Sequence, residues 1–478
     1  QEAERATFLT HQKISVIIIP ANTKEVLACV KIASKFKIPL YPISTGKNWG
    51  NGSKVSVYDG SVLMDLSRMN RIVEYDEHLA YVTIEPGVTQ KQVIEFLNSQ
   101  KSLLSLGVTG SVEDSSIIGN VIERGDATGV YGERCLHVCG FEVVLPNGKL
   151  IRTGFERFLN SACGPLHRHG LGPSLDGLFL QSNLGIITRM TIWLEPKPSH
   201  IYSVIVAIED EKQLKLVLDK LQGLFLKNAF QNLTIWNDIK IFSRLGQYPY
   251  ELAKNQTPLP PKIRLQWRKK YQVTAWMGFI SVLTYTENQA MAQIEMILQE
   301  FKDDNLHLEI SKEEVESNAL GNNQKNVQLA YWRKKYLPET NFDLDKDGCG
   351  LIWCMNVLSF QGADALLANQ IAEDICNKHS FESNIAIIAT ENRTLKFLVA
   401  VIYDRHVKNE DKKAMRCYRE LALAFKKAGY MPYRLGIQGM DMMQSDFKDY
   451  EWVMRGLKKV FDPSHILSPG RYDFTPSP

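Results

Sequence analysis

The sequence predicts an α+β fold in two unlike parts. In the first part, short apolar strands alternate with a few helices and with turns rich in glycine and proline. After a proline-rich break at 195–198, strands alternate with amphipathic helices near 287–302, 363–378 and 410–428. This second rhythm is typical of an antiparallel sheet covered by helices. We therefore expect a domain boundary close to residue 200.

The first part opens with a strand, a helix and a second strand. Apolar runs at 14–19 and 40–43 indicate the strands, and apolar residues at helical spacing lie between them. A glycine-rich segment, 44–53, follows the second strand directly. Glycine at the end of a strand lets backbone amides approach phosphate oxygens closely, so this segment is a candidate phosphate-binding loop.

Turn chemistry marks two further junctions of the first part. Pro86-Gly87 ends a strand, and Thr89 is placed as the N-cap of a helix through 93–97. Asn147-Gly148 joins two apolar runs and predicts a hairpin turn.

The second part begins with a strand at 202–208 and a helix at 211–224. The segment 255–270 carries three prolines among basic residues and is predicted to be a surface loop. Further strands are predicted at 274–283, 350–355, 385–388 and 396–402.

Composition excludes several classes of protein. The 478 residues predict two or three domains, enough to bury a large cofactor. The 56 basic and 53 acidic residues are mixed along the chain, so no basic stripe indicates nucleic acid. No apolar run is long enough for a membrane helix, and the eight cysteines are scattered as free thiols would be. We expect a soluble cytoplasmic protein that binds a small molecule.

Two metal-like motifs are rejected. Cys135, His137 and Cys139 would share one face of a strand but lack a fourth ligand. The acidic run 343–348 imitates the start of a calcium loop, yet Cys354 occupies the position where a bidentate Glu is required. We expect no metal site.

Eight motifs occur in one order along the chain, and together they resemble the vanillyl-alcohol oxidase and p-cresol methylhydroxylase family. The resemblance implies a two-subdomain FAD-binding domain of the p-cresol methylhydroxylase type at 1–200, a cap domain at 201–432 and a C-terminal return at 433–478. The motifs begin at Pro42, Tyr81, Gly119, Tyr131, Gly140, Gly172, Gln181 and Leu467.

The resemblance also assigns residues to FAD. The glycine-rich segment would hold the pyrophosphate, and later turns would line other parts of the cofactor. For any single glycine, a turn with positive φ is the alternative reading. The implied cofactor residues are Ser44, Gly46, Lys47, Asn48, Trp49, Gly50, Asn51, Gly52, Ser116, Gly119, Asn120, Gly125, Gly185, Ile186 and Arg471.

Three residues are implied to be catalytic. Tyr433 and Arg434 match the family's anchor for a phenolate oxygen, where an Arg keeps its charge and a Tyr adds a hydrogen bond. An ordinary ion pair at a domain seam is the alternative for Arg434. Glu133 falls where the family more often places an Asp near the flavin, and a carboxylate there can exchange a proton with the substrate.

Three positions are expected in the substrate pocket, and two of them depart from the family. Phe397 stands where a covalent histidine is usual, so FAD is expected to be bound without a covalent link. Asn51 stands where phenol-oxidising members carry a tyrosine, which indicates a substrate other than a simple 4-alkylphenol. Arg393 is the third expected pocket residue.

The implied function is that of an FAD-linked oxidase or dehydrogenase. It would remove hydride from an activated carbon, benzylic or next to an alcohol or amine, of a phenolic small molecule. A flavoprotein that binds a ligand or catalyses a non-redox rearrangement is one alternative. A dehydrogenase that passes electrons to a cytochrome is another, and a homodimer is expected.

Overall fold

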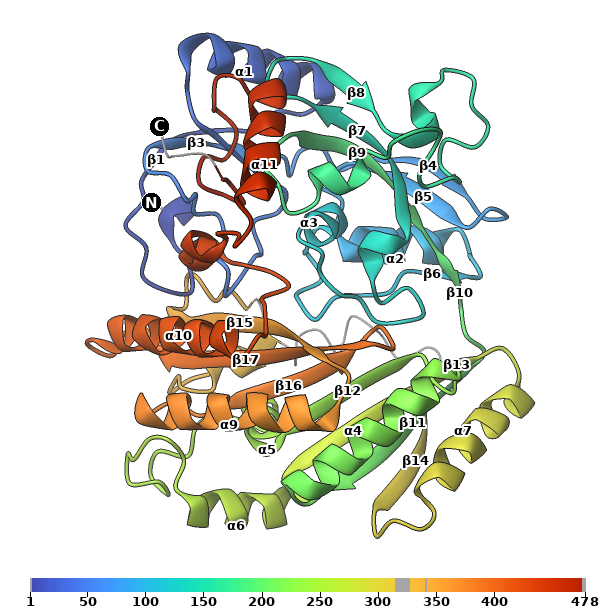
Figure 1. Ribbon diagram of the computed structural model, residues 1–478, viewed down its shortest axis with the longest axis vertical. Helices are drawn as coiled ribbons and strands as arrows, with labels where there is room; N and C mark the ends of the chain where they lie inside the picture. The colour runs from blue at the N-terminus through green and yellow to red at the C-terminus, as the bar shows by residue number, and fades with distance from the viewer. Residues whose placement is uncertain (1, 314–326, 340–341, 475–478) are drawn as a thin grey trace.

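The computed structural model describes residues 2–313, 327–339 and 342–474. Two layers of structure lie one above the other in Figure 1. The upper layer is built from the first 198 residues and the segment after Pro432, and the lower layer from the residues between them. We retain 1–200, 201–432 and 433–478 as proposed domain limits.

Four sheets organise the described residues. The first part contains strands β1 to β10: Ile14–Ile18, Leu40–Ile43, Ser61–Asp65, Ile72–Asp76, Tyr81–Ile84, Leu104–Ser105, Val138–Val144, Leu150–Arg152, Ile186–Trp193 and Glu195–Pro196. The second part contains β11 to β17: His200–Ile208, Asn232–Asn237, Trp276–Thr284, His307–Glu313, Cys349–Ser359, Asn384–Ala389 and Thr394–Asp404.

The helices divide in the same way. The first part contains α1 (Thr23–Phe36), α2 (Gln90–Ser99), α3 (Ile117–Ile122) and, from the end of the chain, α11 (Lys448–Phe461). The second part contains α4 (Glu211–Leu226), α5 (Asp238–Leu245), α6 (Pro261–Tyr271), α7 (Glu287–Phe301), α9 (Gly362–Lys378) and α10 (Glu410–Lys427).

The first part has one parallel sheet and two antiparallel sheets, the smaller of which is the pair β10-β6. Strands β1, β3 and β2 form the parallel sheet in that order, and β4-β5-β9-β7-β8 form the larger antiparallel one. Helix α2 begins where the sequence predicts, because Thr89 and Gln92 form a reciprocal capping box. Gly148 adopts φ +79° in the turn of the β7-β8 hairpin, which confirms that turn.

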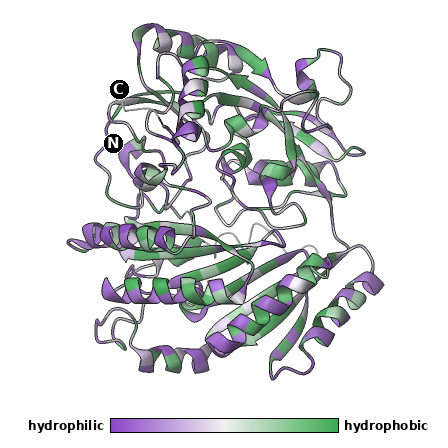
Figure 2. Cartoon of the chain, in the orientation of Figure 1, coloured by the Kyte–Doolittle hydropathy of each residue, from purple (hydrophilic) through white to green (hydrophobic). Residues whose placement is uncertain are grey.

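The second part is one antiparallel sheet of seven strands, in the order β14-β11-β13-β12-β16-β17-β15. Helices α4, α9 and α10 cover one face (Figure 1), and their green, apolar sides face the sheet while purple, polar sides face outward (Figure 2). The predicted α+β class, with an antiparallel sheet covered by helices, is confirmed.

Successive residues along each strand of this sheet point to opposite faces. In β17, Phe397, Val399 and Val401 pack into the core under the helices, whereas Ala400 and Ile402 pack into a separate core with α5 and α6. Helices α5 and α6 cover one end of this second face. The other end of the face is open toward the first part.

The prediction of a surface loop at 255–270 is wrong over its second half. Pro261 occupies the first turn of α6, where its missing N–H is not needed, and the helix buries Trp267 against Phe242. The prolines therefore begin a helix. The sequence prediction also omitted β12 and α5, which contribute to the cavity described below.

The C-terminal return is tied to the first part by a buried lysine. Leu467 lies beside Leu40 in a parallel bridge, which extends the three-stranded sheet. Lys458 donates to the carbonyls of Asn183 (2.9 Å) and Leu467 (3.0 Å) and pairs with Asp462 at 2.8 Å. Because these groups are buried, the lysine satisfies two carbonyls and one carboxylate that water does not reach.

Replacing this lysine should loosen the return. We expect Lys458→Met to lower the free energy of unfolding by about 3 kcal/mol, because it leaves Asp462 as a buried, unpaired carboxylate. Urea denaturation of the FAD-loaded protein measures this change. Lys459→Met on the exposed side of the same helix is the matched control and should change stability by less than about 0.5 kcal/mol. Equal effects of the two substitutions would contradict the role given to Lys458.

Candidate functional site

A cavity of about 1070 Å³ lies where the two parts meet. This volume exceeds the roughly 300–1,000 Å³ typical of small-ligand pockets, so it can hold a large cofactor together with a substrate. Its walls come from the glycine-rich segment, the turns around α3, the open face of the seven-stranded sheet, helix α5 and the C-terminal return.

The glycine-rich segment forms one wall. Gly46 has φ +71° and lies against the Lys54 side chain, so a Cβ there would collide at 2.6 Å. Gly50 and Gly52 do not line the cavity, because they pack against Trp353 and Ile437. The residues of this segment that do line it are Ser44, Thr45, Gly46, Lys47, Asn48, Trp49, Asn51 and Ser53.

A second wall follows the start of α3. The Ser116 hydroxyl caps this helix by accepting from the Gly119 N–H at 2.9 Å. A Cβ on Gly119 would come within 3.3 Å of the Ser44 hydroxyl, so the two walls approach closely. Gly125 packs against Asn120 and does not line the cavity. The expected residues on this wall are Ser116, Gly119, Asn120, Gly185, Ile186 and Arg471.

A buried ionic network closes the C-terminal side. Arg471 donates to Glu123 and to the Tyr41 hydroxyl (3.2 Å), and Tyr472 donates to Glu123 at 3.2 Å. Burial lowers the pKa of Arg471, but Glu123 outweighs burial and raises it overall. Arg434 adds to this network, with Nε 3.8 Å from the Glu123 carboxylate.

Arg434 therefore takes part in an ion pair where the two parts meet and also lines the cavity. Its guanidinium donates to the Asn48 side chain, and its Nε has no hydrogen-bond partner among the described residues. Two further buried oxygens on the cavity wall, Asn51 Oδ1 and Asn120 Oδ1, also lack one. Buried polar atoms are normally satisfied, so these three mark where a polar ligand fits.

A lysine from the cap joins two carboxylates from the first part. Lys396 of β17 bonds to both Asp126 and Glu133, and the Thr390 hydroxyl donates to Glu133 at 2.5 Å. Asp126 and Thr390 line the cavity, whereas Lys396 and Glu133 do not. Of the two carboxylates bound to Lys396, Asp126 is therefore the one that faces the cavity, and sequence reasoning missed it.

Burial shifts the pKa values of the groups in this cluster. Burial raises the pKa of Asp126 to about 6, against the lowering effect of Lys396. Burial also lowers the pKa of Lys396, but its two carboxylates raise it overall, so the lysine stays charged. Tyr433 lies with its ring 5.2 Å from Lys396 Nζ, and burial raises its pKa to about 12. Its hydroxyl therefore remains a donor at neutral pH.

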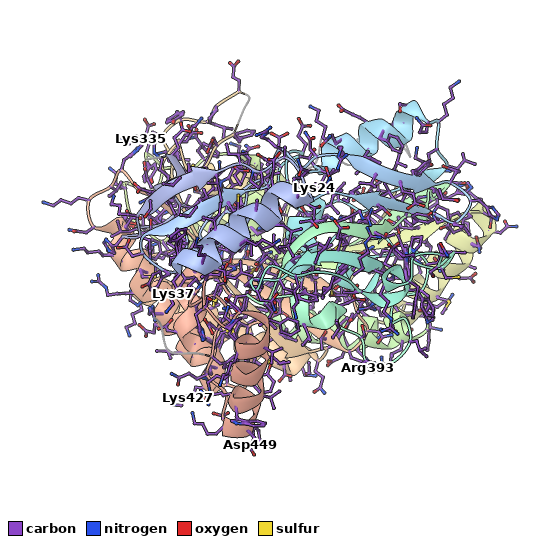
Figure 3. All side chains as sticks on the ribbon, turned by 90° about the horizontal axis from the view of Figure 1, so that it is seen from above. Lys24, Lys37, Lys335, Arg393, Lys427 and Asp449 are labelled. Atoms are coloured by element: carbon purple, nitrogen blue, oxygen red, sulfur yellow. The ribbon has the colours of Figure 1, made fainter. Side chains whose placement is uncertain are left out.

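Two expected pocket residues lie elsewhere. Phe397 packs against Phe425 under the helices, because neighbouring residues of β17 point to opposite faces and its neighbour Leu398 takes the cavity side. Arg393 is exposed in the turn before β17 and bonds to Asn392 at 2.7 Å; Figure 3 shows it near the edge of the molecule. Neither lines the cavity, so both assignments are corrected.

The cap contributes two cations that sequence reasoning missed. Lys240 and Arg244 lie four residues apart on α5 and both line the cavity. Each stands over an indole ring, Lys240 Nζ at 5.1 Å from the Trp353 ring centroid and Arg244 Cζ at 4.3 Å from that of Trp236. Helical spacing could have found the pair, had α5 itself been predicted.

The described residues contain no group of three or more His, Cys, Asp or Glu side chains that could hold a metal ion. Among them, too, no helix is long and apolar enough to cross a membrane.

Comparison with known proteins defines the class first. Residues 14–154 match the family model described as an FAD binding domain. The structure superimposes on that of p-cresol methylhydroxylase with substrate bound with a TM-score of 0.90 and 27% sequence identity, covering 98% of this chain and 91% of the other. The protein is an FAD-dependent flavoprotein oxidoreductase.

Relatives along the full chain define the family. The chain is 40% identical to 1'-carboxy-chondrochloren decarboxylase of Chondromyces crocatus, covering 99% of this chain and 93% of the relative. It is 29% identical to the 4-cresol dehydrogenase [hydroxylating] flavoprotein subunit of Pseudomonas putida, covering 96% and 87%. The chain belongs to the vanillyl-alcohol oxidase and p-cresol methylhydroxylase family of FAD-binding proteins.

The wall chemistry fits a polar cofactor such as FAD. The close approach at Gly119 and the unsatisfied Asn120 oxygen provide room and hydrogen-bonding capacity for a polar cofactor. No histidine or cysteine lies among the described residues that line the cavity. Neither side chain is therefore in place to bond to a flavin methyl group.

We expect acid precipitation to release the flavin. After trichloroacetic acid treatment, the yellow colour should remain in the supernatant, as the sequence-based expectation of FAD without a covalent link requires. Absorption spectra of pellet and supernatant measure the partition. Flavin that stays with the washed pellet would show that a side chain is bonded to it.

Proposed function

We propose that this protein removes a hydride from the carbon attached to the ring of a para-substituted phenol. The observation that carries the proposal is the group of Tyr433, Arg434 and Asp126 on one cavity, with Lys396 holding Asp126 in place. FAD, when bound, supplies the hydride acceptor. The residues proposed to hold it are Ser44, Gly46, Lys47, Asn48, Trp49, Asn51, Ser116, Gly119, Asn120, Gly185, Ile186 and Arg471.

Tyr433 and Arg434 are proposed to bind the phenol oxygen. The Tyr433 hydroxyl has only a weak contact to the Met355 sulfur, at 3.6 Å, so it is free to turn toward a better acceptor. Arg434 has an unused Nε–H in the same cavity. Donors fixed in a dry site stabilise the negative charge that hydride loss requires on that oxygen.

Asp126 is proposed to accept the phenol proton. It faces the cavity and, with a pKa of about 6, is ionised at neutral pH yet basic enough to be protonated in turn. Glu133, the acid singled out from the sequence, is held by Lys396 and Thr390. We therefore assign Glu133 a positioning role and give the proton transfer to Asp126.

The reaction of one relative suggests a second step. The Chondromyces crocatus relative is named a decarboxylase of a 1'-carboxy compound. Loss of hydride and of the phenol proton leaves a quinone methide. If the next carbon bears a carboxylate, its C–C bond can break, carbon dioxide leaves, and the electron pair forms a C=C bond while the ring oxygen becomes phenolate again. We propose oxidative decarboxylation as the second candidate reaction.

Anaerobic mixing with phenols tests the proposed function. The FAD-loaded protein should lose its visible flavin absorption when mixed with 4-alkylphenols or hydroxybenzyl alcohols in the absence of oxygen. A panel that leaves the flavin oxidised throughout would overturn the proposal. Admission of air to the reduced protein then distinguishes oxygen from a protein electron acceptor, the arrangement that the name "flavoprotein subunit" of the Pseudomonas putida relative suggests.

Tyr433→Phe should slow flavin reduction. Loss of a hydrogen bond to a developing phenolate costs about 1.5–3 kcal/mol, so we expect kcat/KM to fall by roughly 10- to 100-fold. Stopped-flow absorbance measures the rate. Tyr450→Phe, on exposed helix α11, is the control and should leave the rate unchanged. Equal rates for Tyr433→Phe and the parent protein would remove Tyr433 from the anchor.

The ionisation of Asp126 should determine the acid limb of the pH–rate profile, where the rate falls at low pH. Below a pH of about 6 its carboxyl is protonated and cannot take the phenol proton, so the rate should fall about tenfold per pH unit there. Asp126→Asn should lower the rate at pH 8 and abolish this limb. Rates measured from pH 5 to 9 test both points, and an unchanged limb in Asp126→Asn would assign it to another group.

A further inference from the structure

The positive charge on α5 lacks a counter-charge on its own helix. The sole acid of α5, Asp238, turns to α6, where it pairs with Arg264 at 2.6 Å and Arg268 at 2.5 Å. Lys240 and Arg244 line the cavity instead, so α5 places Lys240 there without a carboxylate from its own helix.

Lys240 is unusual among the lysines of the protein because it is buried without a described carboxylate partner. It is only 5% exposed, and no described carboxylate lies within salt-bridge distance of its ammonium group. Its contact is with the ring of Trp353 at 5.1 Å. Burial, and to a smaller extent the nearby charge of Arg244, lower the pKa of Lys240 to about 7.

Such an arrangement is costly for the empty protein. A buried ammonium without an anion carries a desolvation penalty of several kcal/mol, and a like charge at i+4 adds repulsion. An anionic group that enters the cavity beside Lys240 would relieve this cost. The cavity is therefore electrostatically complementary, on its cap side, to a negatively charged ligand.

The position of Lys240 relative to Tyr433 indicates which kind of ligand would bind. Trp353, under Lys240, and Met355, beside the Tyr433 hydroxyl, are two residues apart on β15 and both line the cavity. Residues at that spacing share one face and lie about 7 Å apart. A single small molecule can thus reach both Tyr433 and Lys240.

We propose that Lys240 binds a carboxylate on the para side chain of the phenol substrate. The inference rests on the proposed function, because it takes Tyr433 and Arg434 as the anchor for the other end of the same molecule. The two indole rings hold the cations in place, so little side-chain entropy is lost when the carboxylate binds. The substrate class is a 4-hydroxyphenyl compound with a carboxylate-bearing side chain.

A matched pair of phenols tests the proposal. The FAD-loaded protein is titrated with 3-(4-hydroxyphenyl)propionate, which carries the carboxylate, and with 4-ethylphenol, which does not. Binding is followed by the perturbation of the flavin spectrum, and flavin reduction is recorded separately under anaerobic conditions. Lys240→Met should weaken the carboxylate probe by roughly 10- to 100-fold relative to 4-ethylphenol, the usual worth of a charge-assisted hydrogen bond.

Further variants separate charge from packing. Lys240→Arg should restore part of the preference for the carboxylate, because it keeps the charge. Lys262→Met, an exposed lysine on α6, should leave the ratio of the two affinities unchanged. Lys240→Met should keep or raise thermal stability, since it removes the buried charge, so a failure to fold is not expected.

The outcomes are distinguishable. Equal weakening of both probes in Lys240→Met, or loss of FAD from this variant, would overturn the carboxylate site and assign the lysine to packing or to the cofactor. Selective, Lys240-dependent binding of the carboxylate without any flavin reduction would support the site while overturning the proposed oxidation. Reduction of the flavin by both phenols, with no effect of Lys240→Met on the ratio of their affinities, would support the proposed oxidation and overturn the carboxylate site.

Discussion

The alternation of side chains along the seven-stranded sheet is the constraint on which the site depends. Each strand gives one set of residues to the core under α4, α9 and α10 and the next set to the opposite face. That second face is where Trp236, Trp353, Met355 and Leu398 meet the cavity. A shift of one residue in register would bury Lys396 under the helices and bring Phe397 to the cavity, so the contact of Lys396 with Asp126 and Glu133 exists only in this register.

The same constraint explains how far the sequence could predict the site. Motif order correctly indicated the family, the FAD and the α+β architecture, since these depend on local turns such as the capping box at Thr89. It also indicated residues that do line the cavity, including Tyr433, Arg434 and Arg471. What it could not provide was the face of a strand whose two sides are both buried, because apolar residues there show no alternation with polar ones. Phe397 was misplaced for that reason.

Other residues were missed because they act through contacts between distant segments. Asp126 and Lys396 are 270 positions apart in the chain, and only the closure of the cap over the first part brings them together. Lys240 carried no signal because α5 was not predicted. A short helix after a strand, in a segment without glycine-rich turns, has few local features to mark it.

The C-terminal return affects how the protein is made as well as how it is held together. Tyr433, Arg434 and Arg471 are synthesised after the whole cap, yet they complete walls whose other residues belong to the start of the chain. Domains generally fold as units while the chain emerges from the ribosome, but here the first unit lacks one side until the last helix arrives. Because the residues from Tyr433 onward are made last, we expect the cofactor site to be completed, and FAD to be captured, late in biogenesis.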